Sequence, residues 1–228
     1  MDGGGDVPKH NLEVVPGLEE SIARGIDGGV MLSQLGAESS KHDIGIAGIK
    51  SMDIPDSWSQ TREVYQTRGD RMTFTPAGQG DLALTVINKG RSLNETQLAN
   101  FDAVLSTADQ SGRPKVLLPS QIRSITDALD KTTVGDNQYV NQAKPPDPTS
   151  PVFKVTSAQV ITVDGKPVVE IEGQFLDENG QRIKDYIGMF GKVEGNKVGQ
   201  VFVQSSSKDD FIRGRKVYKD ALSSLDWK

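Results

Sequence analysis

The last third of the chain, residues 158–227, most constrains the fold, because apolar segments separated by turn residues lead into one amphipathic segment. Val160–Val163 and Val168–Ile171 are β-branched runs. Asp164-Gly165 between them is a strong hairpin signal, since glycine accepts the positive φ of a tight turn. Two further strands are predicted after the next turns, at Ile183–Phe190 and Val198–Val203. The pattern predicts a four-stranded antiparallel meander.

The second of these strands alternates between apolar and acidic side chains. Val169, Ile171 and Phe175 share one parity, whereas Glu170 and Glu172 have the other. Such alternation is typical of an antiparallel sheet that is covered on one side only. We therefore expect one buried face and one face in contact with solvent.

A helix is predicted to follow the meander and to close the fold. Ser207 stands three residues before Asp210. This spacing predicts that Ser207 is the N-cap and that Asp210 lies in an acidic first turn. An apolar stripe then recurs at helical spacing, at Phe211, Tyr218, Leu222 and Leu225. We expect this helix to pack across the sheet, with Trp227 completing the core at the chain end.

The middle of the chain predicts two more strands and two more helices. The strands are expected at Met72–Pro76 and Leu82–Asn88. One helix should start after Asn94, with Gln97 at the reciprocal capping position, and the other after Pro119-Ser120, with serine as the cap. Antiparallel strands with helices beside them indicate an α+β fold, an antiparallel sheet covered by helices.

We predict one domain with an extension. Residues 1–50 are glycine-rich at the start and hold eight acidic against four basic residues, which suits a loosely ordered, flexible amino-terminal extension. In this region Ile44–Ile49 is a short apolar piece that fits either an edge strand or a helical turn. Residues 51–228 are predicted to form a single α+β domain, with a proline-rich exposed loop at 134–150.

Composition excludes several classes of function. A net charge of −5 argues against generic nucleic-acid binding. The absence of cysteine excludes thiol catalysis and cysteine-ligated zinc, and it leaves the redox compartment open. The sequence contains no run of 18 apolar residues, so we predict no membrane-spanning helix. We expect a soluble protein, either cytoplasmic or, if a leader has been removed, periplasmic or secreted.

No catalytic motif stands out, so we predict no catalytic residues, no metal site and no cofactor. The two histidines, His10 and His42, lie in the predicted extension. Ser205-Ser206-Ser207 lacks the flanking glycines of a nucleophile elbow and fits a connection from strand to helix. The adjacent carboxylate pairs lie in turns or at helix starts, where acidic residues serve as caps: Glu19 with Glu20, Asp177 with Glu178, and Asp209 with Asp210.

Basic residues of the closing helix are the candidate functional residues. The final 24 residues hold six basic against four acidic side chains, the reverse of the amino-terminal balance. Four of the cations should lie on the exposed side of the helix: Arg213, Arg215, Lys216 and Lys219. They fit an ordinary solvated helix face, or a docking surface for another protein, an acidic one by charge.

The order of elements resembles the PsbP-like fold group, which holds photosystem oxygen-evolving subunits, a Ran-GTPase-binding protein and many bacterial lipoproteins. The resembling pieces are Ile54–Trp58, the strand pair, the two helices, the meander, the closing helix and Ser223–Trp227. They cover residues 54–227, and the chain departs from the group in its long extension and in residues 134–150. The resemblance implies an adaptor or binding module without catalysis, and it transfers no functional residue.

Three functions remain open at this stage. The missing catalytic groups favour a non-enzymatic protein-binding or adaptor module. A hydrolase built from carboxylates or serines is the alternative from another class, and it requires two buried acidic side chains in one pocket. The third is an interaction protein of a secretion or envelope system whose amino-terminal segment orders on binding.

Overall fold

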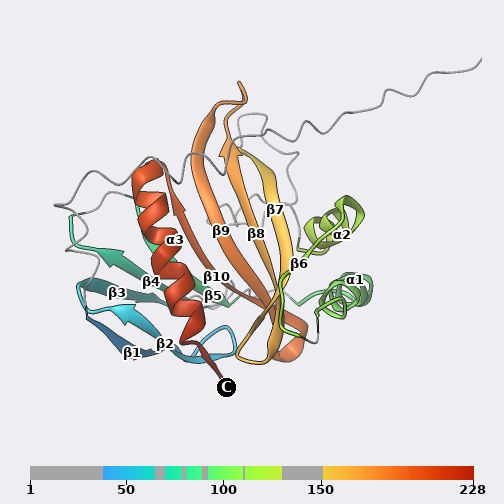
Figure 1. The fold of residues 1–228 in the computed structure, drawn as a ribbon, viewed down its shortest axis with the longest axis horizontal. Helices are drawn as coiled ribbons and strands as arrows, with labels where there is room; N and C mark the ends of the chain where they lie inside the picture. Colours follow the sequence, from blue (N-terminus) through green and yellow to red (C-terminus); the bar gives the residue numbers. More distant parts are fainter. Residues whose placement is uncertain (1–37, 65–69, 79–80, 89–91, 110, 130–150) are drawn as a thin grey trace, which may run out of the picture. The chain divides into compact units, whose positions relative to one another are not determined.

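An eight-stranded antiparallel sheet forms the centre of the fold (Figure 1). The computed structural model describes residues 38–64, 70–78, 81–88, 92–109, 111–129 and 151–228. The order of the strands in the sheet is β3-β4-β5-β10-β9-β8-β7-β6. Their bounds are Trp58–Glu63 (β3), Arg71–Pro76 (β4), Ala83–Asn88 (β5), Lys115–Val116 (β6), Val152–Val163 (β7), Lys166–Leu176 (β8), Arg182–Val193 (β9) and Lys197–Ser205 (β10).

The carboxy-terminal meander is confirmed, and its strands are longer than the sequence predicted. β7 pairs with β8, β8 with β9 and β9 with β10, each time antiparallel. The turn between β7 and β8 is Asp164-Gly165, and both residues have positive φ, 44° and 76°. A short 3₁₀ turn, Glu194–Asn196, joins β9 to β10. Local turn chemistry therefore sets the register of the longest strands.

A second sheet of three strands lies beside the closing helix. β1 (Ser39–Asp43) and β11 (Asp226–Trp227) pair with the two edges of β2 (Ile49–Pro55). The segment Ile44–Ile49, left open by its sequence pattern, provides the turn after β1 and the first residue of β2. The chain end thus returns to the first described strands, and Trp227 packs against the core as predicted.

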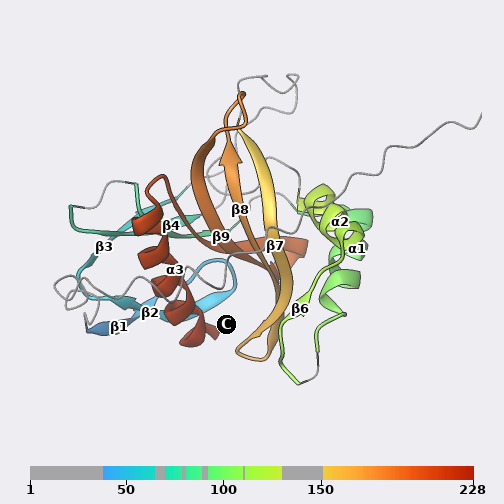
Figure 2. The ribbon, with the colours of Figure 1, turned by 45° about the horizontal axis from the view of Figure 1, so that its top comes forward.

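Two helices cover one face of the large sheet and the third covers the other, as Figures 1 and 2 show. These are α1 (Glu95–Leu105), α2 (Pro119–Leu129) and α3 (Lys208–Ser223). The predicted capping box of α1 is confirmed, with reciprocal bonds between Asn94 and Gln97. α2 starts two residues earlier than predicted, so Ser120 lies inside the helix and is not its cap. Pro119 takes the first helical position, which suits a residue without an N–H.

Both faces of the sheet are therefore buried near its middle, and the prediction of one solvent-exposed face is wrong. On β8, Val169, Ile171 and Phe175 face the core under α1 and α2, whereas Val168 faces the core under α3. Glu170 lies on the α3 side and is only 4% exposed. The alternation of side chains is real, but α3 covers part of the acidic side.

Residues Glu38–Lys228 make up one compact unit. Residues 38–50, which the sequence suggested as part of the extension, belong to this unit because they form β1 and the start of β2. Residues 1–37 and the proline-rich loop at 134–150 lie outside the described residues.

Candidate interaction surface on helix α3

The position of α3 is fixed at its first turn by the predicted serine cap. Ser207 has extended backbone angles, and its hydroxyl accepts a hydrogen bond from the N–H of Asp210 at 3.2 Å. Asp209 and Asp210 follow in the first turn, where the helix dipole favours negative charge. The serine run is thus the connection from β10 to α3 that the sequence suggested.

One side of α3 is buried against the large sheet and β2. Its apolar residues are Phe211, Val217, Tyr218, Ala221 and Leu222. Gly214 lies against Leu82 and Val203 so closely that a Cβ atom there would overlap both side chains. This close approach requires glycine in the helix, despite its cost of about 1 kcal/mol in helix propensity.

The four predicted partner-binding residues lie on the outer side or the edges of α3, and each has a carboxylate partner in the same chain. Arg213 pairs with Asp210, and Lys216 with Asp220 at 2.6 Å, both within the helix. Arg215 and Lys219 instead reach across to β8. Their partners are Glu172, at 3.0 Å, and Glu170, at 2.7 Å. The structure therefore brings two of the four cations together with the acidic side of β8.

Glu170 is the centre of a buried polar cluster under α3. One oxygen, Oε2, accepts from the hydroxyl of Tyr218 at 3.1 Å. The other, Oε1, accepts from the side-chain amide of Gln159 at 2.8 Å, and Lys219 Nζ is 2.7 Å from both oxygens. Burial raises the pKa of Tyr218 well above its usual value, and the charge of Glu170 adds to the rise. Tyr218 therefore stays protonated and keeps donating to the carboxylate.

Glu172 lies two residues further along β8 and is only partly buried. Burial raises its pKa, and the positive charge of Arg215 partly offsets that rise. The neighbouring Glu170 and Asp185 raise the pKa further because they repel a second negative charge. Each acidic side chain on this face has one basic partner, an arrangement that suits structural ion pairs.

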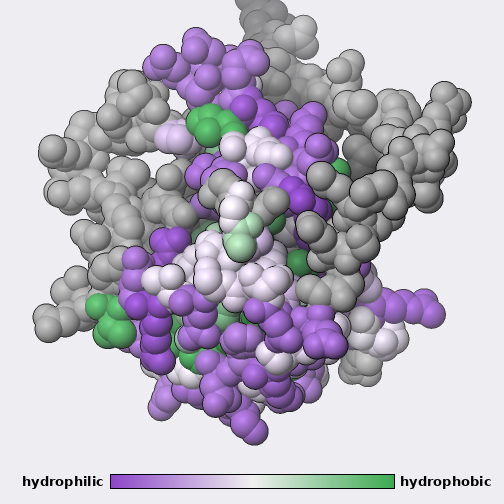
Figure 3. Space-filling model, turned by 90° about the vertical axis from the view of Figure 1, so that its left-hand side faces the viewer, coloured by the Kyte–Doolittle hydropathy of each residue, from purple (hydrophilic) through white to green (hydrophobic). Residues whose placement is uncertain are grey.

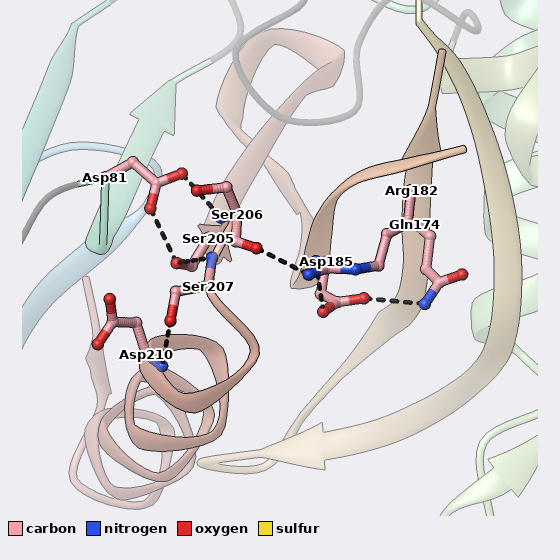
Figure 4. A network of polar contacts seen from close by, with 8 residues as sticks. All are labelled: Asp81, Gln174, Arg182, Asp185, Ser205, Ser206, Ser207 and Asp210. Carbon is pink, nitrogen blue, oxygen red and sulfur yellow. Dashed lines mark hydrogen bonds and ion pairs between the residues drawn. The ribbon is translucent and has the colours of Figure 1, made fainter. Parts of the chain in front are cut away.

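A second polar network joins β5 to the start of α3 (Figure 4). Asp81, just before β5, accepts hydrogen bonds from the Ser205 hydroxyl at 2.9 Å and from the Ser206 N–H at 2.7 Å. Desolvation alone would raise the pKa of Asp81, but the bonds from Ser206 and Ser205 outweigh it and lower the pKa below its usual value. Asp81 thus binds the chain at the point where β10 ends and the helix begins.

The same network continues to β8 and β9. Arg182 donates to the carbonyl of Ser206 at 2.8 Å and to Asp185 at 3.0 Å. Asp185 also accepts from the side-chain amide of Gln174 at 2.9 Å. Figure 4 shows these side chains meeting at the amino-terminal end of α3, so four elements fix the entry of the helix.

Among the described residues, the groups considered for catalysis do not meet in one site. His42 lies on β1, within 3.3 Å of Gln60 and edge-on to Phe74. Asp177 accepts two backbone N–H bonds in the turn after β8, with Glu178 exposed beside it. His10, Glu19 and Glu20 lie outside the described part of the chain. The acidic pairs therefore serve turns and caps wherever they are described.

The described residues contain neither a metal-binding cluster nor a membrane-spanning helix. No group of three or more histidine or carboxylate side chains there could hold a metal ion. No helix there is both long and apolar enough to cross a membrane.

Sequence reasoning missed two features of α3. Ile212 is 66% exposed on its outer side, although it is an aliphatic residue. Its helical position relative to Phe211 and Leu222 could have placed it off the apolar stripe. The burial of Glu170 had no sequence signal, because it depends on where α3 packs.

The side of the molecule that carries β1–β4 and α3 is mostly hydrophilic, with small isolated hydrophobic areas (Figure 3).

Comparisons with known proteins bear on the fold alone. No family model and no curated protein matches the sequence. The solution structure of cyanobacterial PsbP (CyanoP) from Synechocystis sp. PCC 6803 is similar, with a TM-score of 0.51 and 14% identity over 90% of this chain and 99% of that chain. The chain therefore has a PsbP-like fold, as the sequence resemblance implied.

Two crystal structures show a weaker similarity. PA94 of Pseudomonas aeruginosa, a protein of unknown function, has a TM-score of 0.39 and 13% identity over 84% of this chain and 99% of that chain. LpqN of Mycobacterium tuberculosis, involved in cell envelope biogenesis, has a TM-score of 0.41 and 11% identity over 82% of this chain and 89% of that chain.

Proposed function

We propose that this chain is a non-enzymatic protein-binding module that docks an acidic partner through the outer side of α3. The α3 surface consists of Lys208, Ile212, Arg215, Lys216 and Lys219, whose spacing places them along one side of the helix. The observation that carries the proposal is the exposure of Ile212 in the middle of this basic stripe. The helical neighbours of Ile212 are three cations, Lys208, Arg215 and Lys216, and one exposed carboxylate, Asp209. An apolar side chain among mainly basic neighbours suits a small interface with a polar rim.

Arg215 and Lys219 of the α3 surface remain paired with Glu172 and Glu170, but the exposed pair of Lys216 with Asp220 does not oppose this proposal. Lys216 and Asp220 are 62% and 64% exposed, so solvent screens their attraction. Exposed pairs of this kind contribute about 0–1 kcal/mol, and a carboxylate of a partner can replace the intramolecular one at little cost. Lys208 has no ion pair among the described residues, which leaves its charge available.

The rest of α3 supplies a rigid base for such a surface. Its inner side is packed into the core, and its first turn is fixed by Ser207 and by the Asp81 network. A partner would therefore bind a preformed surface and would lose little free energy to ordering it.

The test is site-specific photo-crosslinking in cells of the natural host. A benzophenone amino acid replaces Ile212 in the full chain, and a second version carries it at Glu178, an exposed turn residue away from α3. We expect a protein adduct at position 212 but not at position 178. Adding Lys208→Glu with Lys216→Glu should abolish the adduct, because both changes reverse charges beside residue 212.

The matched control is Lys50→Glu with Lys192→Glu. Both lysines are exposed outside α3, and Lys192 loses an ion pair with Asp102 just as Lys216 loses its pair with Asp220. The control should keep the adduct. Equal crosslinking from positions 212 and 178, or equal loss in the two charge-reversed chains, would refute docking through α3.

A further inference from the structure

The end of the large sheet at β6 exposes a short segment with an unusual combination of side chains. The β6 edge consists of residues 113–118, and every one of them except Leu117 is exposed. In the part of the chain that the structure describes, β6 is the terminal strand of the sheet and β7 is its one neighbour (Figure 2). Leu117 is buried in the core under α1 and α2, and its packing there attaches the segment to the domain.

Two large aliphatic side chains of this segment point away from the core. Val116 is 71% exposed and Leu118 is 64% exposed, on either side of the buried Leu117. The backbone is held in place, because the Leu117 N–H donates to the carbonyl of Ala158 at 2.9 Å and the Leu118 N–H to the side chain of Gln121 at 2.8 Å. The exposed pair is thus displayed on ordered structure, where a contiguous apolar patch indicates an interaction site.

The charge around this pair is positive, in a chain whose net charge is −5. Residues 111–123 hold Arg113, Lys115 and Arg123 and no acidic side chain. Arg113 and Lys115 form no ion pair with any described residue. The preceding carboxylate, Asp109, accepts the N–H of Ser111 at 2.8 Å. The charge of Lys115 helps to lower the pKa of Asp109, but unlike the cations of α3 neither Arg113 nor Lys115 forms an ion pair with a carboxylate in the described part of the chain.

The backbone of β6 has one edge that no strand among the described residues pairs with. Lys115 lies opposite Val160 and Val116 opposite Gln159, and the bond from Leu117 to Ala158 shows which residues pair inward. In an antiparallel pair the bonded residues alternate, so the N–H and C=O of Val116 point away from β7. Such an edge can accept one more extended segment.

We propose that the β6 edge is a second docking surface, which binds an extended acidic peptide segment of a protein partner. Carboxylates of the segment pair with Arg113 and Lys115, its backbone bonds to Val116, and an apolar side chain covers Val116 and Leu118. This inference rests on the proposed protein-binding role and adds a second site to it. β7 lies between β6 and β8, the strand whose Glu170 and Glu172 pair with Lys219 and Arg215 of α3. The β6 edge and the α3 surface are therefore different elements, and the proposal gives the chain two docking surfaces, as an adaptor requires.

An anionic membrane is a poorer occupant for this surface. Each basic residue near a lipid surface contributes about 1 kcal/mol, so Arg113 and Lys115 together supply a weak attraction. The chain's net charge of −5 opposes that attraction. A short acidic segment feels mainly the local cations.

The experiment selects peptides against the full chain from a phage-displayed library of random dodecamers. We expect enriched peptides that combine acidic with aliphatic residues, and amide shift changes centred on Val116 and Leu118 in NMR spectra with the synthetic peptides. Arg113→Glu with Lys115→Glu should weaken their binding about 100-fold, since each reversed pair costs about tenfold or more. Val116→Ser with Leu118→Ser should weaken it about tenfold.

Three results would overturn the proposal. The first is a selection that enriches no acidic peptide. The second is that the enriched peptides bind the Arg113→Glu, Lys115→Glu chain as tightly as they bind the natural chain. The third is flotation with vesicles of phosphatidylcholine and phosphatidylglycerol that depends on Arg113 and Lys115 while no peptide binds. Lys208→Glu with Lys216→Glu should leave peptide binding unchanged, so failure here and failure of the α3 surface are separable.

Discussion

The two faces of the large sheet are buried by different kinds of side chain. The core under α1 and α2 is rich in aromatic rings: Phe101, Phe153, Phe175, Tyr186, Phe190 and Phe202. Tyr186 stacks on Phe202 with ring centres 5.6 Å apart and meets Phe153 edge-on at 5.4 Å. The core under α3 is mainly aliphatic, and buried or partly buried charges border it at Glu170, Glu172 and Asp185.

This difference in side chains indicates that the helices are attached to the two faces of the sheet by different interactions. Aromatic side chains stabilise a core mainly through the large apolar area that they bury, and each well-placed ring pair adds about 0.5–1.5 kcal/mol. Hydrogen-bonded charges are favourable in one arrangement only, and a half-satisfied cluster is costly. We infer that the aromatic face supplies more of the stability, and that the polar clusters fix the position of α3 and so the surface it presents.

The largest expected effect compares one phenylalanine on each face. Phe202→Ala and Phe74→Ala both remove a fully buried ring, the first under α1 and α2 and the second on the α3 side. Each should lower the free energy of unfolding by about 3–5 kcal/mol. Phe202→Ala also removes the stack on Tyr186, whereas Phe74→Ala removes an edge-on contact with the half-buried ring of His42, so we expect Phe202→Ala to cost up to about 1 kcal/mol more.

Urea denaturation of both variants measures this difference, with unchanged m-values as the sign that the unfolding transition is comparable. A larger loss for Phe74→Ala would reverse the ranking of the two faces. Equal losses would show that the stack on Tyr186 adds no more than the contact of Phe74 with His42.

The next effect concerns the charge at the centre of the α3 face. Glu170→Ala leaves the buried hydroxyl of Tyr218 without its acceptor and Lys219 without its partner. Breaking such a buried cluster should lower the free energy of unfolding by about 3 kcal/mol. The matched variant is Glu172→Ala, two residues along the same strand, which should cost less because burial already raises the pKa of Glu172 and disfavours its charge.

Thermal unfolding of the two variants at neutral pH checks this prediction. If Glu170→Ala and Glu172→Ala shift the melting temperature equally, the buried cluster has no special role in holding α3.

The sequence predicted the local parts of this fold well. The hairpin at Asp164-Gly165, the capping box at Asn94 and the cap at Ser207 are each determined by a few neighbouring residues, and all are confirmed. Period-2 and helical patterns located β4, β5 and the four strands of the meander. Such signals predict elements because the same side chains make the local bonds and form the buried face.

What the sequence could not predict depends on contacts between distant residues. β1, β6 and β11 are short strands without a strong pattern of their own, and each is a strand only because a partner strand binds it. The cations of α3 were placed correctly on the helix, but their pairing with Glu170 and Glu172 spans more than 40 residues. The docking role predicted for Arg213, Arg215, Lys216 and Lys219 stays a prediction.

The smallest expected effect tests whether the Asp81 network also fixes α3. Asp81→Asn keeps the shape of the side chain but removes the charge that Ser205 and Ser206 donate to. Hydrogen bonds to charged groups contribute about 1.5–3 kcal/mol when buried. Asp81 is exposed, so solvent screening reduces the expected loss to about 1 kcal/mol at neutral pH.

The pH dependence of this loss makes the test specific. The folded pKa of Asp81 lies below its usual value, because the bonds from Ser206 and Ser205 outweigh desolvation. Its contribution is therefore fully present above the unfolded pKa of about 3.9, and it disappears as the pH falls through the lowered folded pKa. The natural chain and Asp81→Asn should thus differ in urea midpoint at about pH 7, and the difference should disappear as the pH falls below the lowered folded pKa. A difference that persists unchanged into acid would mean that the amide disturbs the turn by its shape, and that the charge of Asp81 does not hold the start of α3.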